Sequence, residues 1–102
     1  MRIEGLLPVG SVVLLQQGKH RVMIIGYCQK LISQPEQVYD YVGCLFPEGY
    51  INAEQNYLFN REQIDKVYHV GYQTDGQFAF VQKMEDAIVR LRHSGENQNN
   101  EP

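Results

Sequence analysis

Hydrophobic positions divide the chain into four segments of strand type and one of helical type. The strand segments are rich in β-branched and aromatic residues, which favour a pleated sheet, and polar or glycine-containing stretches separate them. They cover residues 12–15, 21–27, 38–44 and 64–72. In segment 21–27 the apolar side chains follow one another without strict alternation, which indicates a strand covered on both faces.

The connections carry signals of turns and loops. Residues 30–36 are polar and contain Pro35, so we expect a loop there. Residues 45–50 contain Pro47 and Gly49 and predict a turn. Asn60 precedes a short segment that can form a single helical turn, with the asparagine as its N-cap.

The last apolar segment predicts an amphipathic helix. Thr74 or Asp75 can cap its start, and Thr74 together with Gln77 fits a capping box. Its apolar residues recur at spacings of three and four, which places them on one face of a helix. This stripe, which can cover one side of a sheet, consists of Phe78, Val81, Met84, Ile88 and Leu91.

The order of these elements predicts an α+β fold. Strands that follow one another with short connections pair antiparallel and twist. We therefore expect a small, twisted antiparallel sheet of about four strands, which could close like a barrel, with a C-terminal amphipathic helix. We expect residues 1–93 to form a single globular domain. Residues 94–102 lack large apolar side chains and are expected to form a disordered polar tail.

Length and charge narrow the class of protein. A chain of 102 residues suits one domain, and none of its apolar runs approaches the roughly 18 residues of a membrane span. The net charge of −3 argues against a protein that works chiefly by neutralising phosphates. Cys28 and Cys44 are too few for a disulfide scaffold and are expected to be buried thiols. Because no signal-peptide pattern is present, we expect a cytoplasmic protein without a membrane association.

Chemistry-bearing residues do not gather in the pattern of a catalytic or metal site. His20, His69 and His93 share no ligand spacing with one another or with the cysteines, whereas a zinc site needs three or four convergent ligands. The sequence has neither a nucleophile motif nor a glycine-rich phosphate loop. Glu85 and Asp86 are adjacent carboxylates that we place on the solvated side of the helix. We therefore expect no enzyme, no metal and no cofactor.

The seven tyrosines are a high number for so short a chain. Tyrosine is enriched in protein interfaces, but it also packs across strands at the edge of a core. On a sheet surface it can stack on nucleic-acid bases; the acidic balance argues against this, since such binders add a basic groove, and the basic residues form only one small cluster at 19–21. The candidate partner-binding residues are Tyr27, Tyr39, Tyr41, Tyr50, Tyr68 and Tyr72.

Several motifs follow one another in an order that resembles a known family. They are Leu7-Pro8-Val9-Gly10-Ser11 with the strand after it, Met23-Ile24-Ile25-Gly26, Tyr39-Asp40-Tyr41-Val42-Gly43-Cys44 with Pro47-Glu48-Gly49-Tyr50, Phe59-Asn60, Ile64-x-x-Val67 and Gly71-Tyr72. The succession covers residues 7–91 and resembles the domain of unknown function 4176 family. Members of that family are small Gram-positive proteins, typically encoded beside LXG-type toxins of the type VII secretion system.

The resemblance implies an accessory function without catalysis, and it assigns no catalytic residue. A member is expected to be a cytoplasmic chaperone or targeting factor that binds a cognate LXG-type toxin before export. We expect the sheet to present tyrosines, or an exposed edge strand, to an extended part of the toxin, which strand addition would bind through main-chain hydrogen bonds. The alternative is a small-barrel nucleic-acid-binding protein, whose binding would fall steeply with salt.

Overall fold

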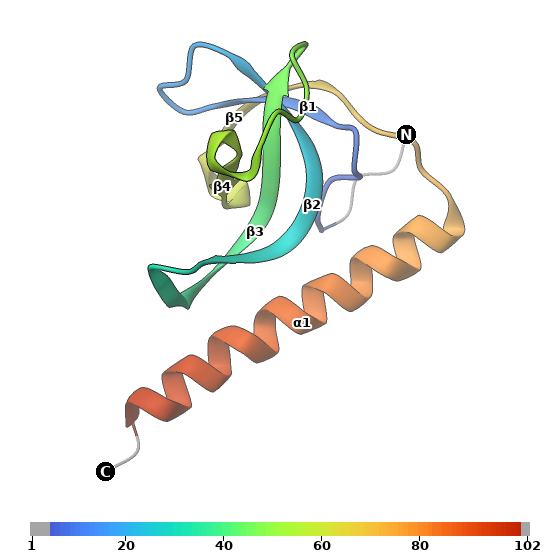
Figure 1. The fold of residues 1–102 in the computed structure, drawn as a ribbon. Coiled ribbons are helices and arrows are strands. Elements are labelled where there is room, and N and C mark those ends of the chain that lie inside the picture. Colours follow the sequence, from blue (N-terminus) through green and yellow to red (C-terminus); the bar gives the residue numbers. More distant parts are fainter. Residues whose placement is uncertain (1–4, 101–102) are drawn as a thin grey trace.

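A computed structural model describes residues 5–100 of the chain, with the side chains of residues 5–93. The described part is an α+β fold, as predicted, with one antiparallel sheet and a C-terminal helix (Figure 1). In chain order the elements are β1 (Val12–Leu15), β2 (Arg21–Leu31), β3 (Gln34–Phe46), the 3-10 turn η1 (Ala53–Gln55), β4 (Tyr57–Phe59), the 3-10 turn η2 (Arg61–Gln63), β5 (Ile64–His69) and α1 (Asp75–Asn100).

The sheet is curled and open, and in the described residues it does not close into the barrel that the sequence allowed. Its strand order is β4-β3-β2-β1-β5, and every pair is antiparallel. β4 and β5 form its two edges, and within the described residues no pairing joins them. Residues 60–63 alone link the end of β4 to the start of β5, so the edges approach each other at η2. There the backbone N–H of Gln16, just after β1, donates to the carbonyl of Gln63 at 2.8 Å.

The sequence predicted about four strands and missed β4, and it predicted a loop where β2 and β3 continue. β4 has three residues, which is too short for a periodic pattern. Segment 30–36, predicted as a loop, is the end of a long hairpin in which Leu31 pairs with Gln34. Side chains 29–37 are all exposed, so no hydrophobic alternation marks them as strand although their backbones are paired.

Irregular pairing produces the curl. The register shifts between Ile24 and Gly26 in the β2–β3 pair, and it shifts twice in the β1–β5 pair. A bulge places an extra residue on one strand, bends that strand and increases its twist. β2 is accordingly curved in Figure 1.

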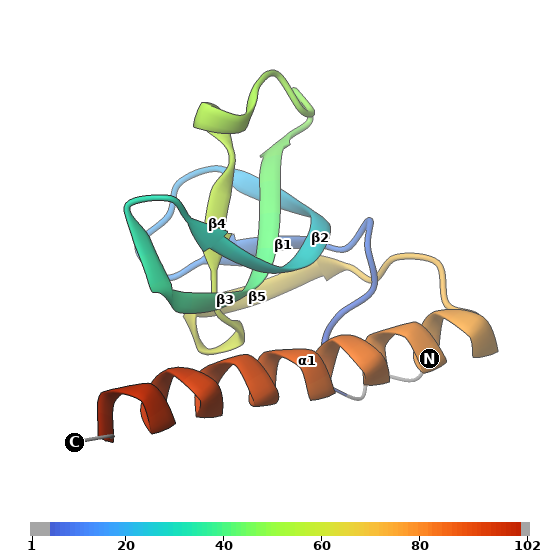
Figure 2. The ribbon, with the colours of Figure 1, turned by 60° about the horizontal axis from the view of Figure 1, so that its bottom comes forward.

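The core lies between the sheet and α1, which runs across one side of the sheet in Figure 2 and packs on β3 and β2. It also takes in the segment before β1, which brings apolar side chains into the same cluster. Its buried members are Leu6, Leu7, Val13, Val22, Ile24, Tyr27, Val38, Tyr41, Phe59, Val81 and Ile88.

The start of α1 confirms Thr74 as the predicted N-cap, but the predicted capping box is incomplete, because the side-chain oxygen of Gln77 has no hydrogen-bond partner. The hydroxyl of Thr74 accepts from the backbone N–H of Gln77 at 2.9 Å, and the carbonyl of Thr74 accepts from the N–H of Phe78 at 3.0 Å. These bonds satisfy donors that lack a partner within the first helical turn. No helix in the described part is long and apolar enough to cross a membrane.

The face that α1 turns to the sheet is only partly the predicted apolar stripe. Val81 and Ile88 are buried, Phe78 and Met84 are partly buried, and Leu91 is exposed. Between the apolar positions, on the same side of the helix, stand Glu85 and Arg92, which are bonded to η2 and β3. The predicted polar tail, 94–102, lies outside the residues whose side chains are described.

Candidate protein-binding surface

Two of the six candidate tyrosines are structural. The hydroxyl of Tyr27 donates to the carbonyl of Leu7 at 2.6 Å, and the hydroxyl of Tyr41 accepts from the N–H of Leu7 at 2.9 Å. Both rings are buried, with centroids 6.1 Å apart. Burial raises the pKa of Tyr27 to about 12 and also raises that of Tyr41. The two side chains hold the segment before β1 on the sheet and do not reach the surface.

The structure does not bring the other four tyrosines together. Tyr39 is partly buried in β3, Tyr50 is exposed in the connection between β3 and β4, and Tyr72 is 86% exposed in the connection between β5 and α1. Tyr68 projects from β5 and is 46% exposed. Of the six, Tyr68 alone lines the open cleft described below.

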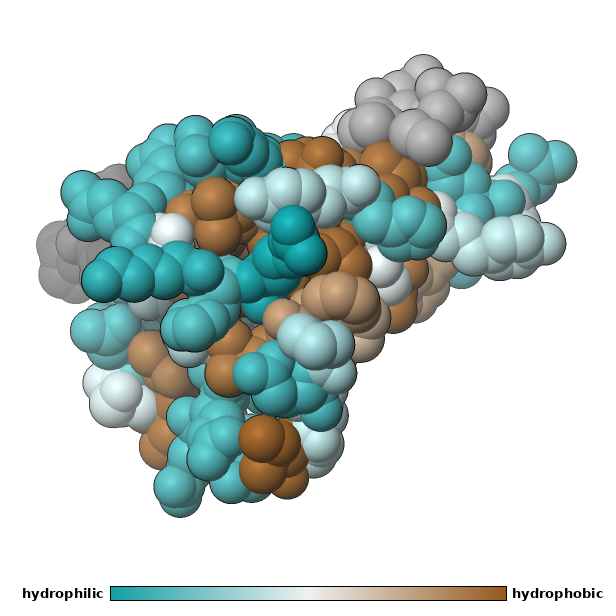
Figure 3. All heavy atoms as spheres, turned by 90° about the horizontal axis from the view of Figure 1, so that it is seen from above, coloured by the Kyte–Doolittle hydropathy of each residue, from teal (hydrophilic) through white to brown (hydrophobic). Residues whose placement is uncertain are grey.

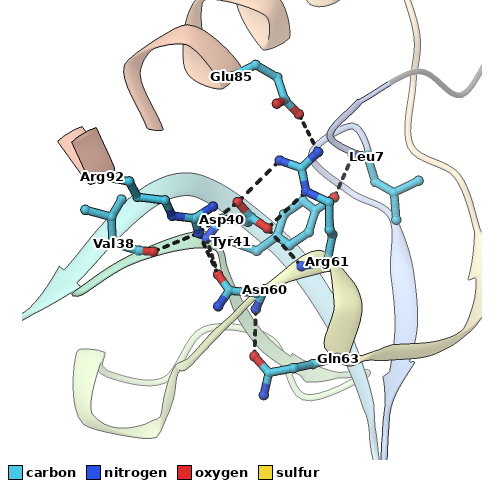
Figure 4. Close-up of polar contacts among 9 residues, drawn as sticks. All are labelled: Leu7, Val38, Asp40, Tyr41, Asn60, Arg61, Gln63, Glu85 and Arg92. Atoms are coloured by element: carbon cyan, nitrogen blue, oxygen red, sulfur yellow. Dashed lines mark hydrogen bonds and ion pairs between the residues drawn. The ribbon is translucent and has the colours of Figure 1, made fainter. Parts of the chain in front are cut away.

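A charged cluster lies under the helix (Figure 4). Asp40, in the middle of β3, is 1% exposed. Its Oδ2 accepts from the backbone N–H of Arg61 at 2.9 Å and from Nε of the same arginine at 3.1 Å. Nη2 of Arg92 reaches Oδ1 of Asp40 at 3.3 Å and the carbonyl of Val38 at 2.9 Å. The cluster thereby joins β3, η2 and α1.

The remaining members satisfy the polar groups around Asp40. The side-chain oxygen of Asn60 accepts from the N–H of Asp40 at 2.9 Å and from Arg92 at 3.1 Å, while the N–H of Asn60 donates to Gln63 at 2.8 Å. Nη1 of Arg61 lies 2.8 Å from Oε1 of Glu85. The placement of Glu85 on a solvated side of the helix was therefore wrong, because it faces the sheet; Asp86 is exposed as predicted.

Charge balance fixes the ionisation of this cluster. Burial alone would raise the pKa of Asp40, but hydrogen bonds and charge from Arg61, with Arg92 beside it, lower that pKa below its ordinary value. The same bonds raise the pKa of Arg61. The carboxylate is thus ionised and fully partnered at neutral pH, as buried charges in folded proteins are. Its role is to dock α1 and η2.

The opposite face of the sheet carries an open cleft of about 540 Å³. It lies over β1, β2 and β5 and the end of β3. Much of its lining is apolar, and Phe46 and Tyr68 are both partly exposed in it. The lining residues are Gly10, Val12, Arg21, Met23, Phe46, Tyr68 and His69.

Register explains why these residues meet. His69, Val12, Met23 and Cys44 are paired in one row across β5, β1, β2 and β3. Residues paired across antiparallel strands share a face, and so do positions two apart on one strand. The same face therefore carries the next pairs along, Arg21 with Phe46 and Leu14 with Lys66. We call these eight paired residues together with Tyr68 the outer face.

The outer face is basic in an acidic protein. Its paired positions include Arg21, Lys66 and His69 and no acidic residue, whereas the whole chain has a net charge of −3. The guanidinium of Arg21 lies 4.3 Å from the ring centroid of Tyr68, a cation–π contact that holds the cleft residue in place. Seen from above, hydrophobic side chains are exposed among hydrophilic ones over the molecule (Figure 3).

The outer face ends at an unpaired strand edge. β5 pairs with β1 on one side, and no other described strand pairs with it. Residues 65–69 of β5 are all exposed. A strand edge of this kind presents backbone N–H and C=O groups that another chain can pair with.

The histidines, cysteines and carboxylates of the described residues do not form a metal site. Among the described residues, no group of three or more His, Cys, Asp and Glu side chains is arranged to hold a metal ion. Cys44 is a buried free thiol, as predicted, and Cys28 is a partly buried one. Neither cysteine lines the cleft.

Of the residues of this surface, Tyr68 is among the tyrosines that the sequence predicts to bind a partner. Arg21 belongs to the small basic cluster at 19–21, and no sequence pattern marks Phe46 or Lys66 as a binding residue. The outer face depends on register across four strands, which single-sequence patterns do not give. The charged cluster had one usable signal, since a carboxylate at Asp40 within an apolar strand demands buried partners.

Comparison with known proteins gives one match. The family described as Domain of unknown function (DUF4176) matches residues 6–80. No curated protein and no solved structure matches the chain.

Proposed function

We propose that this chain, which belongs to the domain of unknown function 4176 family, is a cytoplasmic, non-enzymatic accessory protein. It binds a cognate LXG-type toxin and acts as its chaperone or targeting factor for type VII secretion. The toxin occupies the outer face.

One observation supports this proposal above the others: the apolar cleft stands open beside an unpaired strand. Phe46 is 40% exposed and Tyr68 is 46% exposed in the cleft. Aromatic anchors in a pocket, with an arginine beside them, are the residue types that carry most binding energy in protein interfaces. The charged cluster under α1, in contrast, has its groups engaged within the chain.

Co-expression tests the function. The full chain is tagged and expressed with each toxin-like reading frame that lies near its gene, and the purified material is examined for a stoichiometric second protein. We expect one toxin to remain bound through moderate salt. Recovery of the folded chain without any such toxin would contradict the proposal.

Surface variants test the location. Tyr68→Ala and Phe46→Ala should each reduce toxin recovery, because each removes an aromatic side chain from the cleft. Val89→Ala is the matched control: it also truncates a half-exposed apolar side chain, but on α1, away from the cleft. If the cleft variants fold and recover as much toxin as Val89→Ala does, the toxin binds elsewhere.

The alternative, a nucleic-acid-binding protein, is favoured by the stack of Arg21 on Tyr68 beside Lys66. Single-strand binders combine basic residues with aromatic rings. Here one face of the Tyr68 ring is covered by Arg21, and the chain as a whole is acidic. Retention of single-stranded oligonucleotides that falls steeply with salt would establish the alternative.

A further inference from the structure

We infer that the outer face recognises an extended, acidic segment with an apolar or aromatic side chain, and that this segment adds as a strand to the free edge of β5. The inference rests on the proposed function in one respect, that the outer face binds protein. It goes further by stating the conformation and the charge of what is bound.

The conformation follows from the edge. β5 runs for six residues, Ile64–His69, and is paired on one side. A partner strand there gains main-chain hydrogen bonds along its length, and its alternate side chains point to the same face of the sheet as those of β5. The other edge, β4, has three residues and offers a shorter template.

The anchor side chain follows from the cleft. The cleft reaches β5 through Tyr68 and His69 and extends across β1 and β2 to Phe46. A side chain that projects from a strand added to β5 toward the outer face can therefore enter apolar surroundings made by Val12, Met23 and Phe46. A volume of about 540 Å³ accommodates a large apolar or aromatic group.

The charge of the bound segment follows from the residues that surround the cleft where it meets β5. Lys66 and His69 project from β5 toward the outer face, and Arg21 lies across the cleft at Tyr68. No acidic residue occupies a paired position of this face; Asp65, the acidic residue of β5, falls between the paired positions Ile64 and Lys66. Acidic residues flanking the anchor therefore meet complementary charge, whereas a basic segment meets repulsion.

Selection from a random peptide library displayed on phage, with the full chain as target, tests the inference without any toxin. We expect the enriched peptides to share an apolar or aromatic residue with Asp or Glu at nearby positions. Synthetic copies of these peptides are then the probes. In hydrogen exchange the amides of β5 should become protected when a peptide binds.

Charge variants supply the decisive measurement. Lys66→Glu should weaken peptide affinity by about tenfold or more and make the binding less dependent on salt. Arg21→Glu should act in the same direction. Lys83→Glu is the matched control, because it reverses an exposed lysine on α1, and its affinity should equal that of the unchanged chain.

Several results would overturn the inference. They are enriched peptides without acidic residues, equal affinities for Lys66→Glu and Lys83→Glu, β5 amides that stay unprotected, and a chain that pairs through β5 with a second copy of itself in sedimentation. Displacement of the peptide by a short oligonucleotide would equally assign the face to nucleic acid.

The two proposals can fail separately. If a toxin co-purifies but no acidic peptide binds, the proposed function is supported and strand addition to β5 is rejected. Acidic peptides that bind at β5 while no toxin co-purifies leave the mode standing and remove the toxin as partner.

Discussion

The two faces of the sheet differ in whether their polar and aromatic side chains are bonded within the chain or exposed to solvent. On the face under α1, Asp40 receives hydrogen bonds from Arg61 and Arg92, and Tyr41 receives one from Leu7. On the outer face, Tyr68 stands half-exposed with a basic rim and an open strand edge beside it. The first face has its groups engaged internally, and the second leaves them available.

This difference separates residues that hold the fold from residues that can bind. A fully partnered buried group cannot contribute to a partner without first losing its own bonds, which costs more than a typical interface contact returns. Variants under α1 should therefore change stability first, and variants of the outer face should change binding with the fold intact.

Asp40→Ala should produce the largest loss. It removes the acceptor of the Arg61 backbone N–H and leaves both arginines without their shared carboxylate. Breaking a buried ion pair from one side costs about 3–5 kcal/mol; because the guanidinium groups are partly exposed, we expect about 3 kcal/mol in urea unfolding. Asp86→Ala, an exposed carboxylate of α1, is the control. Equal stabilities of the two variants would show that the cluster does not dock the helix.

Tyr41→Phe should cost less, about 1–2 kcal/mol, because the N–H of Leu7 keeps its place but loses its acceptor. Tyr72→Phe removes a hydroxyl from an exposed side chain and should change stability by less than about 0.5 kcal/mol. Thermal or urea unfolding measures both. A Tyr41→Phe variant as stable as Tyr72→Phe would mean that the segment before β1 is not held by this bond.

Acid should weaken the face under α1 in a defined direction. The pKa of Asp40 is lower in the folded chain than in the unfolded one, so its ionisation adds stability above the unfolded pKa, about 4. That contribution is lost as the pH falls through the lower, folded pKa. Unfolding measured between about pH 5 and pH 3 should show stability decreasing toward acid. In Asp40→Asn, where the side chain cannot titrate, the decrease should be smaller; an unchanged slope would assign it to other carboxylates.

The secondary-structure elements could be predicted from the sequence better than the contacts between them. The helix cap at Thr74 and the buried positions Val81 and Ile88 each follow from local pattern, because capping and periodicity are properties of neighbouring residues. The pairing of Arg61 with Glu85, and of His69 with Val12, depends on tertiary packing and register. Those contacts build both the charged cluster and the outer face, so the site was only partly predictable.

The tyrosines show most clearly what the sequence alone cannot predict. Tyr27 and Tyr68 each lie in a segment that the sequence predicts as a strand, residues 21–27 and 64–72. One hydroxyl is buried against Leu7, and the other side chain lines an open cleft. What separates them is the face of the sheet and the position of the strand in its order, which no count of tyrosines reveals.

Tyr68→Ala should have the smallest effect on the fold and a clear effect on binding. The variant loses the contact with Arg21, which at an exposed site is worth about 0.5–1 kcal/mol, and it buries no new polar group. Urea unfolding should therefore show a loss of about 1 kcal/mol or less, while toxin recovery falls. A large loss of stability would mean that the outer face also holds the fold together, and the separation between the two faces would then fail. Tyr68→Phe sharpens the test: because it keeps the ring over Arg21, it should retain both stability and binding.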